Sequence, residues 1–335
     1  MKLKTPRWWY RKKPPMPVSR ALLTPLSWAW RGATAWRIAR TNPIDPGAPV
    51  ICVGNLTVGG AGKTPVVRQI LSQLREMGIE AHGLARGYGG SATGAVRVDP
   101  AVHTARDVGD EPLMIAADHP MWVSKDCVVG AKAAAAKGAR AIVMDDGHQN
   151  PTLKKTLSII VVDGETRDGE WPFGDGSVFP KGPMREPLKA GLERADAVVV
   201  LLPSDLPEAD PALLALFGTK PVLVAHLDPA APPPPGPQFG FAGIGKPWKV
   251  ERALKAVGCE LVDFAAFPDH GEYDPATLGA LVRRAKAQGA GLITTEKDWV
   301  RLPAAWRAQV FAWPVVARFQ DERALQRLLS GALAR

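Results

Sequence analysis

The stretch PVICVGNLTVGGAGKT (residues 49–64) decides the fold of this chain of 335 residues. Its first five residues form a short apolar run that predicts a buried strand. A glycine-rich turn follows at residues 57–64, and residues 63–77 then carry apolar side chains at helical spacing. A strand, a glycine-rich turn and a helix in this order are typical of the phosphate-binding loop of nucleotide-binding α/β proteins.

The glycine-rich turn has the chemistry expected of such a loop. Glycines allow successive backbone N–H groups to close around phosphate oxygens at the start of a helix. We expect Lys63 to bridge the β- and γ-phosphates of a nucleoside triphosphate and the Thr64 hydroxyl to ligate Mg²⁺. The alternative is a chance glycine turn with a surface lysine, which the flanking strand and helix disfavour. The expected nucleotide-binding residues are Thr57, Val58, Gly59, Gly60, Ala61, Gly62, Lys63 and Thr64.

A second predicted strand supports a site for Mg²⁺ and a nucleotide such as ATP. Residues 141–144 are apolar and are followed directly by Asp145 and Asp146. An acidic residue at the end of such a strand holds Mg²⁺ directly or through water. The sequence leaves open which of the two carboxylates contacts the metal. A pair of aspartates alone is often only a turn, so this prediction depends on the glycine-rich loop.

The rest of the chain alternates short apolar strands with helices, which predicts an α/β fold with a parallel sheet covered on both faces. We expect a P-loop NTPase-like domain at residues 45–227, a proline-rich linker at 228–238 and a second, smaller α/β domain at 239–335. We expect a last helix from residue 321, and its position in the sequence is compatible with packing on the first domain. Further strands are expected at residues 157–162, 197–202, 221–225, 239–242, 261–267, 291–295 and 310–316.

The net charge of +9 is concentrated in the first 44 residues. This arm holds ten of the 42 Lys and Arg residues and no Asp or Glu, so the rest of the chain is nearly neutral. A basic surface on the body is therefore not predicted, and we expect no nucleic-acid partner. The three cysteines fit neither a disulfide framework nor a zinc site, which favours a reducing compartment.

The arm (residues 1–44) also holds five of the 11 Trp residues. Its residues from Arg20 onward predict an amphipathic helix that Pro25 kinks or restarts. Basic charge with tryptophan is typical of a segment lying in the headgroup region of an anionic bilayer. The alternative is a helix that packs on the body; arginines disfavour a signal peptide, and no uncharged apolar run is long enough to span a membrane. The apolar stripe is Leu22, Leu26, Trp30, Ala33 and Trp36, and the opposite stripe is Arg20, Thr24, Ser27, Arg31 and Thr34.

Four further polar clusters are dense for ordinary loops, although each alone is compatible with turn chemistry. A kinase needs a base for the acceptor hydroxyl and cations around the transferred phosphate. Asp110 and His270 are candidates for an acid–base pair if the two domains face each other. Arg86 and Arg185 are candidates to hold an anionic group of the substrate. The clusters are RGYGG (86–90), GDEP (109–112), PKGPMREP (180–187) and FPDH (267–270).

The order of these motifs resembles one family. The motifs are TVGGAGKTP (57–65), RGYGG (86–90), GDEP (109–112), DDGHQN (145–150), FGDG with PKGPMREP (173–187), FAGIGKP (241–247), FPDHGEY (267–273) and TTEKD (294–298). Together they resemble the tetraacyldisaccharide 4′-kinases, the lipid A 4′-kinases of Gram-negative bacteria, over about residues 15–330. The joint pattern is far more specific than the loop alone.

The resemblance implies two α/β domains with the active site in the cleft between them. It implies ATP- and Mg²⁺-dependent transfer of the γ-phosphate to the 4′-hydroxyl of a tetraacylated glucosamine disaccharide 1-phosphate, forming the lipid A precursor lipid IVA. The family works at the cytoplasmic face of the bacterial inner membrane, as a peripheral protein attached to the anionic surface through its N-terminal helix. We expect a monomer.

The resemblance also implies residue roles. Asp110 matches the proposed catalytic base of the family, and His270 matches its partner. Such a pair makes chemical sense, since an imidazole can position or tune the carboxylate that receives the hydroxyl proton. The chain departs from the family at His148, where an aromatic residue is frequent, and at Gly271, where a second histidine is frequent. The residues that lie in motifs around the substrate are Arg86, Tyr88, Gln149 and Asn150, joined on charge grounds by Arg185, and those near Mg²⁺ are Thr64, Asp145 and Asp146.

Two other classes of protein share some of these features. A membrane-cycling P-loop ATPase switch also pairs a GGxGKT loop with a membrane helix, but it usually carries a lysine where this chain has Val58, and its membrane helix tends to be C-terminal. A GTP-dependent metallochaperone would need a His- or Cys-rich metal site, which the sequence lacks. Nucleotide-dependent dimerisation without lipid phosphorylation would favour the switch.

Overall fold

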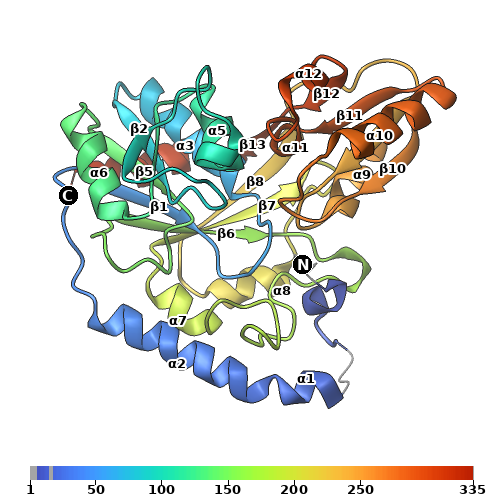
Figure 1. Ribbon diagram of the computed structural model, residues 1–335. Coiled ribbons are helices and arrows are strands. Elements are labelled where there is room, and N and C mark those ends of the chain that lie inside the picture. Colours follow the sequence, from blue (N-terminus) through green and yellow to red (C-terminus); the bar gives the residue numbers. More distant parts are fainter. Residues whose placement is uncertain (1–5, 15–17, 335) are drawn as a thin grey trace.

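The computed structural model describes residues 6–14 and 18–334 (Figure 1). In these residues it forms a nine-stranded sheet, in the order β13-β8-β7-β6-β1-β5-β2-β4-β3, and a four-stranded sheet, in the order β10-β9-β11-β12. The large sheet comprises β1 (Val50–Gly54), β2 (Ala81–Ala85), β3 (Ala95–Arg97), β4 (Met121–Ser124), β5 (Ala141–Asp145), β6 (Leu157–Asp163), β7 (Ala197–Pro203), β8 (Val222–Pro229) and β13 (Val315–Phe319). The small sheet comprises β9 (Gln238–Ala242), β10 (Leu261–Ala266), β11 (Gly291–Thr295) and β12 (Val310–Trp313).

The large sheet is parallel except at its two edges, where β13 pairs antiparallel with β8 and β3 pairs antiparallel with β4. Strand β1 lies between β5 and β6 and is buried over its whole length. Continuous apolar runs are expected of strands that are covered on both faces. The predicted α/β class with a parallel-dominated sheet is therefore confirmed.

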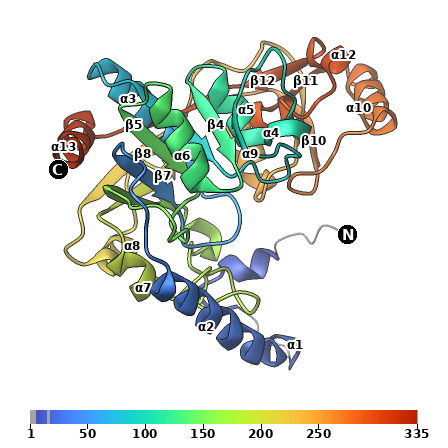
Figure 2. The same ribbon diagram turned by 60° about the vertical axis from the view of Figure 1, so that its left-hand side comes forward.

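Helices cover both faces of the large sheet. On one face α3 (Lys63–Glu76), α5 (Asp110–Ala116) and the C-terminal α13 (Glu322–Leu333) contribute to one apolar core, and Figure 2 shows α13 beside α3. The opposite face is covered by α6 (Cys127–Ala136), α7 (Leu188–Glu193) and α8 (Pro211–Leu214). The other helices are η1 (Arg7–Tyr10), α1 (Val18–Leu22), α2 (Thr24–Arg40), α4 (Ala105–Val108), η2 (Arg167–Gly169), η3 (Ala215–Phe217), α9 (Pro247–Ala256), α10 (Pro275–Ala287), α11 (Glu296–Trp299) and α12 (Ala304–Arg307).

The chain returns to the large sheet near its C-terminus. The single strand expected at residues 310–316 is wrong, because the structure has β12 in the small sheet and β13 in the large one. Pro314 stands between them and lacks the N–H that a continuous ladder would need. Strand β8 also continues to Pro229, which pairs with Val315, so the first residues of the expected linker belong to a strand. Leu325 and Leu329 of α13 then pack in the core of the large sheet.

The arm contains a helix where one is expected, divided into α1 and α2 with Pro25 in the first turn of α2. Helix α2 lies outside the two layers, with α7 between it and the large sheet (Figure 1). Ser27 of the polar stripe is buried and donates to the Val178 carbonyl at 2.7 Å, whereas Leu26 and Trp36 are exposed. Arg31, Arg37 and Arg40 are exposed as well, so the strong amphipathic separation that we expected is not confirmed. None of the described helices combines the length and the apolar character needed to cross a bilayer.

Candidate functional site

The phosphate loop connects β1 to α3. Gly62 precedes the helix with a φ of 75°, and Gly59 has a φ of 102°, both in the left-handed region that glycine adopts without strain. The Asn55 amide donates to the Thr57 carbonyl at 2.9 Å inside the turn. Lys63 and Thr64 open α3, as the motif requires. The turn thus presents backbone N–H groups at a helix N-terminus, which is the arrangement that binds phosphate.

The turn that carries PKGPMREP braces this loop. Thr57 and Met184 form an antiparallel bridge, and the Val58 N–H donates to the Pro183 carbonyl at 2.7 Å. The Arg185 Nε donates to the Thr57 carbonyl at 3.0 Å. A loop that is otherwise rich in glycine is therefore held in place by a second segment more than a hundred residues away in sequence.

Arg185 also forms a bidentate ion pair with Asp146, with Nη1–Oδ1 and Nη2–Oδ2 distances of 2.7 and 3.0 Å. Lys63 Nζ lies 3.5 Å from the same Asp146 carboxylate. Burial by itself would raise the pKa of Asp146, but the charges of Lys63 and Arg185 hold it well below its usual range. Arg185, expected on the substrate side, is thus bound to the carboxylate at the end of β5.

Asp145 differs sharply from its neighbour. Its side chain is buried, and Oδ1 has no hydrogen-bond partner among the described residues. Burial, opposed in part by Lys63 and reinforced by Asp146, raises the pKa of Asp145 to about 7. An orphaned buried carboxylate oxygen beside a phosphate loop, with the Thr64 hydroxyl on the next helix, is a donor set that fits Mg²⁺.

A second cluster lies across the two sheets. Asp110, at the start of α5, is buried, and its Oδ2 lies 2.9 Å from His270 Nδ1. His270 follows β10 in the small sheet and its helices, which we call the smaller unit, and has a φ of 53°. Arg301 Nε lies 3.6 Å from the same Asp110 oxygen. The structure therefore brings together the two residues that the sequence predicted as an acid–base pair, although 160 positions separate them.

Sequence reasoning gave no role to Glu111, Lys297 or Arg301, which surround this pair. Lys297 Nζ lies 2.7 Å from Glu111 Oε1 and 3.3 Å from His270 Nε2. Burial alone would raise the pKa of Glu111, but the Lys297 ammonium lowers it to about 2. Two signals were available: Glu111 stands beside Asp110 in GDEP, and Lys297 lies in TTEKD. Asp110, Glu111 and His270 each offer a ligand atom within 4.8 Å of the others, but Lys297 already balances the charge of Glu111.

The predicted substrate-side residues fall into two groups. Tyr88 is 79% exposed and its ring lies 5.8 Å from the His270 ring, beside the acid–base pair, while Arg86 at the end of β2 is also exposed. Gln149 instead donates to the Asn55 carbonyl at 2.9 Å and to Glu186 at 3.0 Å. Asn150 accepts from the N–H and hydroxyl of Thr152 within its own turn. In this structure Tyr88 faces solvent beside the pair and Arg86 faces solvent after β2, whereas Gln149 and Asn150 support loops.

The smaller unit approaches the phosphate loop directly. A Cβ on Gly245 would lie 3.0 Å from the Gly60 nitrogen, so the GIGKP turn after β9 faces the loop and needs a residue without a side chain. Arg68 of α3 and Glu296 of α11 form an ion pair of 3.0 Å between the same units. The phosphate loop, the β5 carboxylates and the acid–base pair all follow parallel strands or lie at helix starts on this side, which is where open α/β sheets bind ligands.

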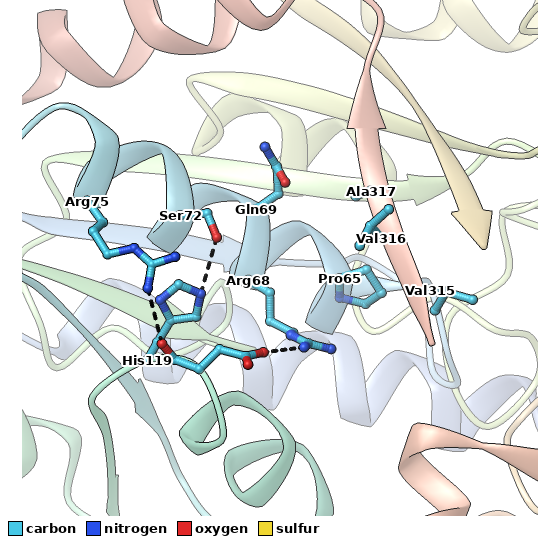
Figure 3. Close-up of a pocket in the computed structure, with 10 residues that line it drawn as sticks. Pro65, Arg68, Gln69, Ser72, Arg75, His119, Val315, Val316 and Ala317 are labelled. Atoms are coloured by element: carbon cyan, nitrogen blue, oxygen red, sulfur yellow. Dashed lines mark hydrogen bonds and ion pairs between the residues drawn. The ribbon is translucent and has the colours of Figure 1, made fainter. Parts of the chain in front are cut away.

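A separate groove of about 310 Å³ lies between α3 and β13, and Figure 3 shows the residues that line it. Arg68 and Arg75 point into it, and His119 contacts the Ser72 hydroxyl at 3.2 Å. No residue of the phosphate loop, the β5 carboxylates or the acid–base pair lines this groove. We therefore place the candidate site at the phosphate loop, where the chemical groups converge, and not in this groove.

Comparisons with known proteins agree with the motifs and the geometry. A sequence model of the family described as tetraacyldisaccharide-1-P 4′-kinase matches residues 19–334. The chain is 69% identical over 330 residues to a tetraacyldisaccharide 4′-kinase of Caulobacter sp. (strain K31), with 98% of each chain covered. It is 67% identical over 332 residues to the protein of the same name from Phenylobacterium zucineum (strain HLK1), covering 99% of this chain and 100% of the relative.

A solved structure of a protein from the same family also matches this chain. The crystal structure of LpxK from Aquifex aeolicus in complex with ATP matches with a TM-score of 0.73 and 25% sequence identity. The match covers 94% of this chain and 99% of that one. The membrane-cycling switch and the metallochaperone are not favoured by these matches. The chain belongs to the tetraacyldisaccharide 4′-kinase family.

Proposed function

We propose that this protein transfers the γ-phosphate of ATP to the 4′-hydroxyl of a tetraacylated glucosamine disaccharide 1-phosphate, forming lipid IVA. The observation that carries the proposal is the pairing of Asp110 with His270 at 2.9 Å, beside a braced phosphate loop. Asp145 connects the two clusters electrostatically, because the charges of both Lys63 and Glu111 act on its pKa. A base for a hydroxyl group and a cradle for a triphosphate are the two parts that a small-molecule kinase needs.

In this proposal Asp110 accepts the proton of the 4′-hydroxyl. The hydroxyl oxygen then forms a bond to the γ-phosphorus, and the bond from that phosphorus to the β–γ bridging oxygen breaks, which leaves ADP. His270 Nδ1 holds the Asp110 carboxylate in place, and Arg301 Nε lies 3.6 Å from the same Oδ2 atom. Lys63 and the backbone N–H groups of the loop stabilise negative charge on the phosphates.

Mg²⁺ would be held by the Thr64 hydroxyl and by the carboxylates of Asp145 and Asp146. When bound, it would neutralise charge on the β- and γ-phosphate oxygens. The unpartnered Oδ1 of Asp145 supports its assignment as a ligand, since a buried carboxylate oxygen without a partner is costly. Both oxygens of Asp146 already accept hydrogen bonds from Arg185. This favours an indirect role for Asp146, in which it would hold Mg²⁺ through a water molecule.

For the acceptor, we propose that the exposed Arg86 and Tyr88 meet the disaccharide beside the acid–base pair. The arm would hold the protein on the cytoplasmic face of the inner membrane as a peripheral monomer. The exposed Trp28 and Trp36 on α2, with the nearby arginines, support contact with an anionic lipid surface. Such contact would place the phosphate loop and the Asp110–His270 pair next to the lipid substrate.

Direct phosphate transfer tests the proposal. The protein is incubated with γ-labelled ATP, Mg²⁺ and a detergent-dispersed tetraacyl disaccharide 1-phosphate, and the lipids are separated. We expect label in the lipid for the wild-type chain and its loss in Asp110→Ala. Hydrolysis of ATP without labelled lipid would contradict the kinase assignment and would favour the switch.

A further inference from the structure

The segment before the family-matched region reaches the nucleotide loop. The family model begins at residue 19, whereas η1 (Arg7–Tyr10) lies upstream of it. Tyr10 is only 3% exposed, and its hydroxyl donates to the Val58 carbonyl of the phosphate loop at 2.7 Å. A Cβ on Gly59 would lie 2.6 Å from the Tyr10 oxygen, so the ring packs directly on the loop.

The segment is anchored to the body by its backbone. The Trp171 N–H donates to the Tyr10 carbonyl at 2.5 Å, and Arg11 forms an antiparallel bridge with Glu170. Lys12 lies over the Trp171 ring, with Nζ at 4.2 Å from its centroid. These contacts fix the backbone beside the loop that follows β6, and so fix the direction in which Tyr10 points.

The same tyrosine contacts the smaller unit. Lys246 Nζ lies 3.9 Å from the centre of the Tyr10 ring and 2.8 Å from Asp163 at the end of β6. Lys246 is itself buried and belongs to the GIGKP turn that faces the phosphate loop. Arg7 lies over the Trp248 ring at 4.2 Å, which adds a second contact to this unit. The ring of Tyr10 therefore stands between the phosphate loop and the turn opposite it.

We propose that Tyr10 is a positioning residue for ATP binding, which holds the Val58 carbonyl and the Lys246 ammonium in one arrangement and so joins the arm to the nucleotide loop. Both backbone groups of Val58 are held, because its N–H donates to the Pro183 carbonyl and its carbonyl accepts from the Tyr10 hydroxyl. Burial raises the pKa of Tyr10 to about 12, so the hydroxyl stays protonated and able to donate. Without this bond the loop would populate other conformations, and ATP would bind only the competent fraction.

Tyr10→Phe tests this inference, because it removes the hydroxyl and keeps the ring on Lys246. We expect the KM and the Kd for ATP to rise about three- to tenfold, the range for the net contribution of one hydrogen bond. The kcat is expected to stay within about twofold and the KM for the lipid acceptor to stay unchanged, since the chemistry is not touched. Lys12→Ala is the matched control: it loosens the same segment without touching the phosphate loop and should keep the wild-type ATP values.

Three outcomes would overturn the inference: an unchanged ATP Kd in Tyr10→Phe, a fall in kcat at constant KM, or an equal ATP defect in Lys12→Ala. The second would mean loss of folded enzyme, and the third would mean general loosening of the segment. The inference rests on the proposed nucleotide site, so Lys63→Ala is measured in the same calorimetric titration with ATP and Mg²⁺. If Lys63→Ala binds ATP normally, the site assignment fails; if only Tyr10→Phe binds normally, the inference alone fails.

Discussion

Lowering the pH from 8 to 6 should weaken Mg²⁺-dependent ATP binding through Asp145. A carboxyl whose pKa is raised to about 7 by burial must lose its proton before it can ligate a cation. It is about nine-tenths ionised at pH 8 and about one-tenth ionised at pH 6. The Asp145 contribution to Mg²⁺ affinity should therefore fall about tenfold over this range, or about 1.4 kcal/mol. The sign follows from competition, because protons occupy the carboxyl increasingly as the pH falls.

The assay is a titration of Mg²⁺ into the protein with ATP at both pH values, with bound nucleotide as the readout. ATP itself takes up a proton in the same range, so the quantity of interest is the difference between the wild-type chain and a variant. Asp145→Asn should bind Mg²⁺ more weakly at pH 8 but lose the extra pH dependence. Asp146→Asn gives a second test: Asp146 itself titrates far below this window, and loss of its charge should lower the pKa of Asp145 and move the transition to lower pH. The reasoning is refuted if Asp145→Asn keeps the full wild-type pH dependence.

Three further predictions follow from the site and the fold. Asp110→Ala should lower kcat by about 10²–10⁴-fold, as removal of a general base does, with ATP affinity nearly intact; equal losses of rate and ATP affinity would place Asp110 at the nucleotide instead. His148 is buried, and its pKa is lowered from 6.5 to about 3, mainly by burial and then by the charge of Lys155. The unfolded chain therefore takes up a proton that the folded chain does not as the pH falls below 6.5. Stability should therefore fall by about 2 kcal/mol between pH 8 and pH 5 through this residue, and urea unfolding of His148→Phe should show a shallower pH dependence than the wild-type chain. Replacing Trp28 and Trp36 by alanine should reduce flotation with anionic vesicles and leave ATP binding unchanged; undiminished flotation would contradict a lipid-contacting role for α2.

Local signals in the sequence were enough for the central part of the fold. The run at residues 49–53, the glycine turn and the helical spacing after Lys63 predict β1, the phosphate loop and α3 because each depends on neighbouring residues. Strand β4 has only four residues, and an apolar run of that length does not distinguish a strand from a buried helical turn. The division of residues 310–316 between two sheets depends on which partner strand is adjacent, and that is a long-range property.

The arm shows a different limit of sequence reasoning. Helical spacing predicted two stripes, but it does not say which stripe contacts the body. Arg20 and Ser27 from the polar stripe are buried against the turn that contains Lys181, where Arg20 pairs with Asp175. Their polar groups are satisfied there, so burial carries little penalty. Of the apolar stripe, Trp30 packs on Phe179, whereas Leu22, Leu26 and Trp36 are left on the outside. A helix that buries polar residues and exposes tryptophan is unfavourable in water alone, which supports the proposed lipid contact.

The two carboxylate pairs of the site share one electrostatic design, which argues for a division of work between their members. In each pair one carboxylate has a close cation: Asp146 has Lys63 and Arg185, and Glu111 has Lys297. The other member keeps capacity for a ligand or a proton, because Asp145 has an oxygen without a partner in the described part of the chain, and Asp110 is held by His270 with Arg301 farther away. Asp146 and Glu111 fix the positions of Lys63 and Lys297, and their neighbours Asp145 and Asp110 are the groups that we propose for metal binding and proton transfer. The sequence motifs show only that the two acids of each pair are adjacent. The cations that give the two acids different charge environments come from segments far along the chain.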